Sequence, residues 1–228
     1  MAIDGMKVID LDSHLVGDLD SWDQTVEAKY KEFLPRKLPT KDNERRKTLV
    51  GNQIMVGSEL GRQKAEKKEW VTPADLTPQG RVRNMDLDGI DVAVLSPNSP
   101  ALDILWFVDD AELGAAYARA QNNYMNGYAS QQQGRLMWAG VIPLQDPKEA
   151  IKELHRARAL GSKALNVKAT PIPGKEWSDP YFDPIFDELE KTKTPIIFHD
   201  TKTGSMGHER FADNFFFSHM VGRTIESM

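Results

Sequence analysis

Three ionisable residues near the amino terminus, Asp10, Asp12 and His14, have the types and the spacing of a metal site. Their segment begins as a β-strand, and strict alternation would place all three on one face, with Ile9 and Leu11 on the other. Asp12 and His14 would lie about 6.6 Å apart along the strand. A carboxylate and an imidazole at that spacing can bind one ion at about 2.0–2.2 Å each. The alternative is that Asp12 caps a turn and His14 is an ordinary hydrogen-bonded histidine.

A distant histidine, His199, strengthens the metal interpretation. It follows the apolar residues 196–198 at the end of a strand-like segment. In a barrel of parallel strands, its side chain could reach the axis and meet those of Asp12 and His14. Two histidines and a carboxylate with one open position form a catalytic metal site. Because the chain has no cysteine, any metal site must use His, Asp or Glu.

These residues must be positioned by a framework in which strands and helices alternate. The helix after Asp146 is well delimited, because Asp146 is a predicted N-cap, Pro147 its first residue and Gly161 its end. Further helices are predicted over 22–34, 79–88 and 110–132, after Asp179, and from 215 to the terminus. Further strands are predicted over 91–97, 136–142, 164–168 and 195–200.

Alternation of this kind with short connections implies parallel strands joined by right-handed crossovers. A doubly wound sheet and a barrel both fit, but no glycine-rich nucleotide fingerprint follows a strand. Polar residues at predicted carboxyl ends of strands, where barrel enzymes place their sites, favour the barrel; they are His14, Asn98, Lys168 and His199. We therefore predict an α/β fold, a TIM (β/α)8-type barrel with about five of its eight βα units in this chain.

A basic segment interrupts the pattern after the first predicted helix. Residues 36–68 carry ten Lys or Arg against four Asp or Glu, a net charge of +6. We interpret an insertion at about 36–76 within a single domain, 1–228, as a solvated excursion or lid. The alternative is an anion-attracting rim over the site.

Composition sets the remaining bounds. The net charge is −5, so nucleic acid and anionic membranes are not expected partners. No apolar stretch is long enough to span a bilayer, and no basic start precedes an apolar run. We expect a cytoplasmic protein.

Taken together, the motifs resemble the amidohydrolase-related, metal-dependent barrels, a group that includes α-amino-β-carboxymuconate-ε-semialdehyde and γ-resorcylate decarboxylases. The similarity rests on segments that occur in the same order along most of the chain: 9–14, 85–95, 142–147, 197–200 and 217–220. The resemblance implies that Asp12, His14 and His199 bind one divalent ion, most readily zinc, with manganese as the alternative.

The chain departs from the family pattern in two ways. Members typically add an aspartate ligand from the eighth strand and a histidine after the sixth, whereas this chain ends at Met228, inside what would be the fifth helix of the barrel. We therefore predict the N-terminal part of a barrel, from a fragment, a split gene or a truncated gene model. The first and fifth strands would then be edges that invite association, so we expect a homo-oligomer.

The predicted activity is non-oxidative decarboxylation of a small anionic substrate, with Lys168 and Asn98 as substrate-binding residues. Metal-dependent hydrolysis of a C–N or C–O bond and a non-catalytic truncated remnant are the alternatives. His219 is the candidate acid–base residue, because the start of a helix would keep its imidazole neutral. It could instead be a solvent-facing or packed histidine. Asp200, which could orient His199, and His208 have weaker claims.

Overall fold

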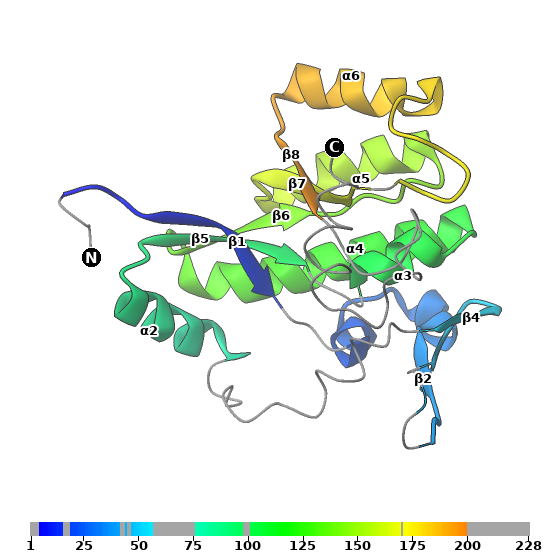
Figure 1. Cartoon of the computed structure of the whole chain (residues 1–228), viewed down its shortest axis with the longest axis horizontal. Coiled ribbons are helices and arrows are strands. Elements are labelled where there is room, and N and C mark those ends of the chain that lie inside the picture. The colour runs from blue at the N-terminus through cyan, green and yellow to red at the C-terminus, as the bar shows by residue number, and fades with distance from the viewer. Residues whose placement is uncertain are drawn as a thin grey trace.

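A computed structural model describes residues 5–15, 19–41, 44, 47–56, 76–97, 101–169 and 171–199. Five parallel strands form a curled sheet in the order β1-β5-β6-β7-β8. Their bounds are β1 Ile9–Leu15, β5 Val92–Pro97, β6 Leu136–Gly140, β7 Ala164–Lys168 and β8 Ile196–His199. The curl and the helices between consecutive strands confirm the predicted TIM-type architecture, and the described residues hold five strands with the four helical connections between them (Figure 1).

The helices begin and end largely where their local signals predict. They are α2 Pro78–Asp88, α3 Ala101–Phe107, α4 Ala111–Ala129, α5 Pro147–Leu160 and α6 Asp183–Thr192. Asp146 caps α5 by accepting a hydrogen bond from the Lys148 amide, and Gly161 ends it in the left-handed region at φ 109°. Gly89 ends α2 in the same way, at φ 75°. A glycine adopts this conformation without the strain a side chain would add.

One prediction about a helix was wrong, and one helix differs from its prediction only in its last turn. Residues 22–34 do not form one α-helix but contribute to two short 3-10 helices, η1 Leu19–Gln24 and η2 Ala28–Phe33. Glu27 between them is extended (φ −65°, ψ 142°) and interrupts the helical path. The predicted helix over 110–132 ends at Ala129 and continues as the 3-10 turn η4, Ser130–Gln132. The short helix α3 was not predicted, and another 3-10 turn, η5 Pro180–Phe182, precedes α6.

The basic segment is partly a structure of its own. It forms a small antiparallel sheet of β2 Arg36–Leu38, β3 Lys47–Val50 and β4 Gln53–Val56. Val50 and Met55 join Trp22 and residues of α3 and α4 in one apolar cluster. Figure 1 shows this sheet and α3 on the side toward which the five parallel strands point. Part of the segment is therefore anchored beside the carboxyl ends of the strands, while residues 42–43, 45–46 and 57–75 of the predicted insertion lie outside the described residues.

The two faces of the sheet differ in their neighbours. Leu165 and Val167 of β7 pack among side chains of α5 and α6. Because side chains alternate along a strand, Asn166 and Lys168 face the opposite, concave side of the curl. Ser96 of β5 faces the same side, since its neighbour Leu95 packs in the cluster that includes α4 and α5 residues.

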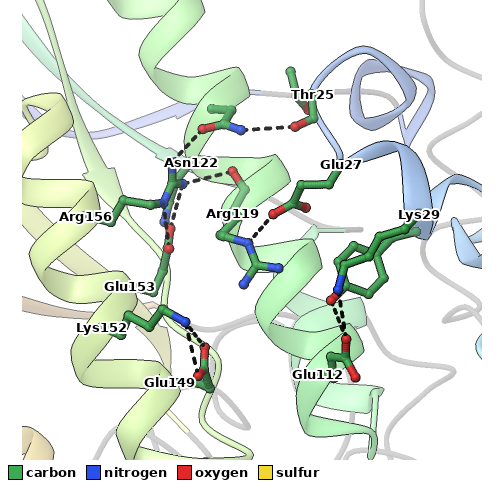
Figure 2. Close-up of polar contacts among 12 residues, drawn as sticks. Thr25, Glu27, Lys29, Glu112, Arg119, Asn122, Glu149, Lys152, Glu153 and Arg156 are labelled. Atoms are coloured by element: carbon green, nitrogen blue, oxygen red, sulfur yellow. Dashed lines mark hydrogen bonds and ion pairs between the residues drawn. The ribbon is translucent and has the colours of Figure 1, made fainter.

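A buried polar network joins α4 to its neighbours. Glu153 of α5, 4% exposed, accepts hydrogen bonds from Asn122 at 2.6 Å and from Arg156 at 2.8 Å. Arg119 of α4 pairs with Glu27 (Figure 2). Asn123 donates to the Thr25 carbonyl at 3.0 Å. These contacts hold the first 3-10 segments and α5 against one helix. Within the described part of the chain, no helix is both long and apolar enough to cross a bilayer.

Candidate metal centre

The sheet brings together the three residues that the sequence singled out as metal ligands. Asp12 and His14 come from β1 and His199 from β8, the two outermost strands of the described sheet. His14 lies opposite Ser96 in β5, and His199 lies opposite Lys168 in β7, so both histidines stand at carboxyl ends. The curl of the sheet therefore makes neighbours of residues that are 185 positions apart in the sequence.

The ligand atoms converge. His14 Nε2 lies 2.7 Å from His199 Nε2, and Asp12 Oδ1 lies 3.5 and 3.3 Å from those two nitrogens. Atoms that share an ion at about 2.0–2.2 Å stand roughly 2.9–3.5 Å apart, so the two oxygen–nitrogen distances fit and the nitrogen pair is slightly closer. The two rings meet edge to face, with planes at 85°.

The protonation chemistry of the pair also fits a cation. A hydrogen bond between two imidazole nitrogens needs one N–H and one lone pair, whereas a shared ion would use a lone pair from each. In His199, Nε2 is the nitrogen directed at Asp12 and His14. The other ring nitrogen, Nδ1, is buried without a hydrogen-bond partner among the described residues. The side chains of Asp12, His14 and His199 are 76%, 34% and 16% exposed, which leaves the centre open on the aspartate side.

Asp10 does not face the centre as strict alternation predicted. Asp10 lies opposite Ala93, but Ser13 lies opposite Leu95, so the β1–β5 register shifts between them. Ala93 packs among the residues covered by helices, and Asp10 therefore has the opposite orientation from His14. A one-residue bulge reverses the alternation of every residue beyond it. The carboxylate of Asp10 instead accepts a hydrogen bond from the Asp12 amide at 2.9 Å.

Arg81 of α2 holds the strand end that carries His14. Its guanidinium donates to Ser13 Oγ at 2.9 Å and to the His14 carbonyl at 2.6 Å. Burial raises the pKa of the nearby Tyr128 hydroxyl, and the Arg81 guanidinium beside it acts in the opposite direction. The sequence analysis missed Arg81; its place in a capped helix directly before β5 was the available signal.

Lys168 lies on the concave side but is not an open cation. Its Nζ is 3.7 Å from Asp103 Oδ1 and 4.4 Å from the centre of the Trp106 ring, both on α3. Lys168, Trp106 and Asn166 help to line a cavity of about 20 Å³, space for about one water molecule. The other predicted site residues, Asn98, Asp200, His208 and His219, lie outside the described residues.

Comparison with known proteins identifies the family of this chain. A family model described as amidohydrolase matches residues 9–225. The chain belongs to the amidohydrolase family. The chain is similar to the γ-resorcylate decarboxylase of Rhizobium radiobacter, with 29% identity over 125 residues that make up 52% of this chain and 37% of the relative. The 2-amino-3-carboxymuconate-6-semialdehyde decarboxylase of Dictyostelium discoideum is 28% identical over 123 residues, 54% of this chain and 33% of the relative.

A solved structure of similar fold supports the architecture. The dihydroxybenzoic acid decarboxylase of Polaromonas sp. JS666, determined with manganese and the inhibitor 2-nitroresorcinol, superposes with a TM-score of 0.63 at 18% identity. The match covers 97% of this chain and 57% of that structure. The chain thus spans about a third of the length of the curated relatives that it matches, and rather more than half of the structural neighbour.

Proposed function

We propose that this chain contributes the metal-binding half of an enzyme that removes a carboxyl group from a small anionic substrate without oxidation. The observation that carries the proposal is the convergence of Asp12, His14 and His199 between the ends of β1 and β8. The decarboxylase relatives support the reaction type. Their substrates, by name, are a resorcylate and a carboxymuconate semialdehyde, so an aromatic or muconate-type carboxylate is the proposed substrate class.

The three side chains would hold one divalent ion, zinc or manganese. Two imidazoles and a carboxylate suit either metal. The manganese bound in the Polaromonas enzyme favours manganese here. The ion would supply Lewis acidity toward a substrate carboxylate or carbonyl oxygen. Asp12, with its 76% exposed side chain, leaves room for substrate on the open side of the centre.

Protein groups would orient the substrate and deliver the proton. When the C–C bond breaks and CO2 leaves, the electron pair stays on the substrate carbon, which must then take up a proton. We assign that proton transfer to His219, and we assign anion recognition to Lys168 and Asn98. Lys168 supports this assignment by its register beside His199 on the concave side of the sheet.

A direct test is to incubate the purified chain with Mn²⁺ and γ-resorcylate and to measure CO2 release and bound metal together. The expected result is metal-dependent CO2 release that His199→Ala abolishes along with the bound ion. The control variant His155→Ala changes a histidine that is 52% exposed and pairs with Glu188 on the helical side, and it should retain both. The chain could bind the metal, release no CO2 from γ-resorcylate or carboxymuconate-type acids, and cleave esters or amides. That result would contradict the proposed decarboxylation and support hydrolysis instead.

A further inference from the structure

The metal-ligand end of β1 departs from regular strand geometry at one point. Ile9 lies opposite Val92 and His14 opposite Ser96, so five steps along β1 match four steps along β5. The extra residue falls between Asp10 and Ser13, where the register shifts. Bulges of this kind redirect a side chain locally and are frequent beside active sites.

The bulge is held by a side chain rather than by the strand ladder. The Asp12 amide donates to Asp10 Oδ1 at 2.9 Å. A backbone N–H displaced from the ladder needs another acceptor, and the carboxylate two residues earlier supplies it. This hydrogen bond restrains the backbone of Asp12, the ligand with the most exposed side chain of the three.

Arg81 restrains the next two residues of β1, Ser13 and His14. Its two terminal nitrogens reach Ser13 Oγ and the His14 carbonyl at 2.9 and 2.6 Å. Hydrogen bonds from a guanidinium are stronger than neutral ones. They attach the end of β1 to α2, whose first turn is itself capped by Thr77.

We infer that Asp10 and Arg81 are positioning residues that set Asp12 and His14 in ligand geometry before an ion binds. The inference rests on the proposed metal site but not on the proposed reaction. Neither residue supplies a ligand atom to the three-residue cluster. Groups that orient metal ligands typically alter metal affinity about 10–100-fold when they are removed.

The test is Mn²⁺ binding to the intact chain, followed through the electron paramagnetic resonance signal of free Mn²⁺. Asp10→Ala and Arg81→Met should each raise the Kd about 10–100-fold. Asp10→Asn keeps an oxygen acceptor at the same atom and should restore affinity. Arg135→Met is the matched control, because Arg135 donates hydrogen bonds to the Asp91 and Ile90 carbonyls at the opposite end of β5. The Kd of this variant for Mn²⁺ should stay at the wild-type value.

A second readout needs no metal. In the metal-free chain, amide exchange of Asp12 should be faster in Asp10→Ala than in the wild type and should return to the wild-type rate in Asp10→Asn. An equal loss of affinity in Arg135→Met and Arg81→Met, or no loss in Asp10→Ala, would overturn the inference.

The two proposals fail in different ways. A wild-type chain that binds no Mn²⁺ overturns the metal site and this inference together. A chain that binds Mn²⁺ but releases no CO2 overturns only the decarboxylation.

Discussion

Lys168 is a charged side chain at a buried position, where a charge is destabilising unless it is compensated. Its side chain and that of Asp103 are 5% and 6% exposed, and the ammonium also lies over the Trp106 ring. Taking an ammonium out of water costs several kcal/mol unless an opposite charge compensates it. Asp103 supplies that charge from α3, and the pair keeps a cation on the concave side of the sheet.

At the residue scale, removing one partner of this pair should be worse than removing both. Asp103→Leu removes the carboxylate partner of the buried ammonium and should lower the free energy of unfolding by about 3–5 kcal/mol. The double variant Asp103→Leu/Lys168→Met replaces both charges by apolar groups and should recover most of that loss. Urea unfolding at neutral pH measures both. Equal losses in the single and the double variant would show that the two charges do not compensate each other.

Asn122 shows how elements are joined around β6. Its amide donates to the Val141 carbonyl at 2.9 Å and to Glu153 at 2.6 Å, and its oxygen accepts from the Val141 amide at 2.9 Å. One side chain of α4 thus satisfies the backbone just beyond β6 and a buried carboxylate of α5. The fit is close, because a Cβ at Gly140 would lie 3.2 Å from Ala157 Cβ and 3.3 Å from Asn122 Oδ1.

At the element scale, Asn122→Ala should lower the free energy of unfolding by about 3 kcal/mol or more, since each buried polar group left without a hydrogen bond costs about 1–3 kcal/mol. The control is its neighbour Asn123, which is only partly buried and bonds to the Thr25 carbonyl and to Arg156. Asn123→Ala should lower the free energy of unfolding by a smaller amount. The ranking is checked by urea unfolding, and a larger effect for Asn123→Ala would contradict the central role assigned to Asn122.

The molecule as a whole presents apolar groups along its outermost strands. Ile9 and Leu11 of β1 are 53% and 63% exposed, and Phe198 of β8 is 48% exposed. Outermost strands with such side chains invite pairing with other chains. The homo-oligomer expected from the sequence remains a prediction, and these residues are where we expect the contacts.

At this scale, light scattering of the purified chain should report a mass that rises with concentration. Leu11→Lys should reduce this association, because a lysine on an edge strand opposes pairing. The matched control is Leu87→Lys on α2, where the leucine is 80% exposed but does not belong to a strand. A monodisperse monomer at all concentrations, or equal effects of the two variants, would exclude association through β1.

The sequence by itself determined what depends on near neighbours along the chain. Asp146 and Gly161 set the limits of α5 through contacts within a few residues, and the apolar run of β5 specifies a strand buried on both faces. The order of these elements, with polar residues at strand ends, was enough to predict the barrel architecture and to single out Asp12, His14 and His199.

Tertiary structure alone decided the features that depend on partners distant in sequence. Asp10 faces away from the centre because the pairing of β1 with β5 inserts a bulge, which alternation within β1 cannot reveal. Lys168 is compensated by Asp103 because the unpredicted helix α3 lies against the end of β7. Arg81 reaches His14 across 67 positions of sequence. Each of these contacts follows from how the sheet curls and how helices pack on it, and that packing is a property of the whole chain rather than of any local pattern.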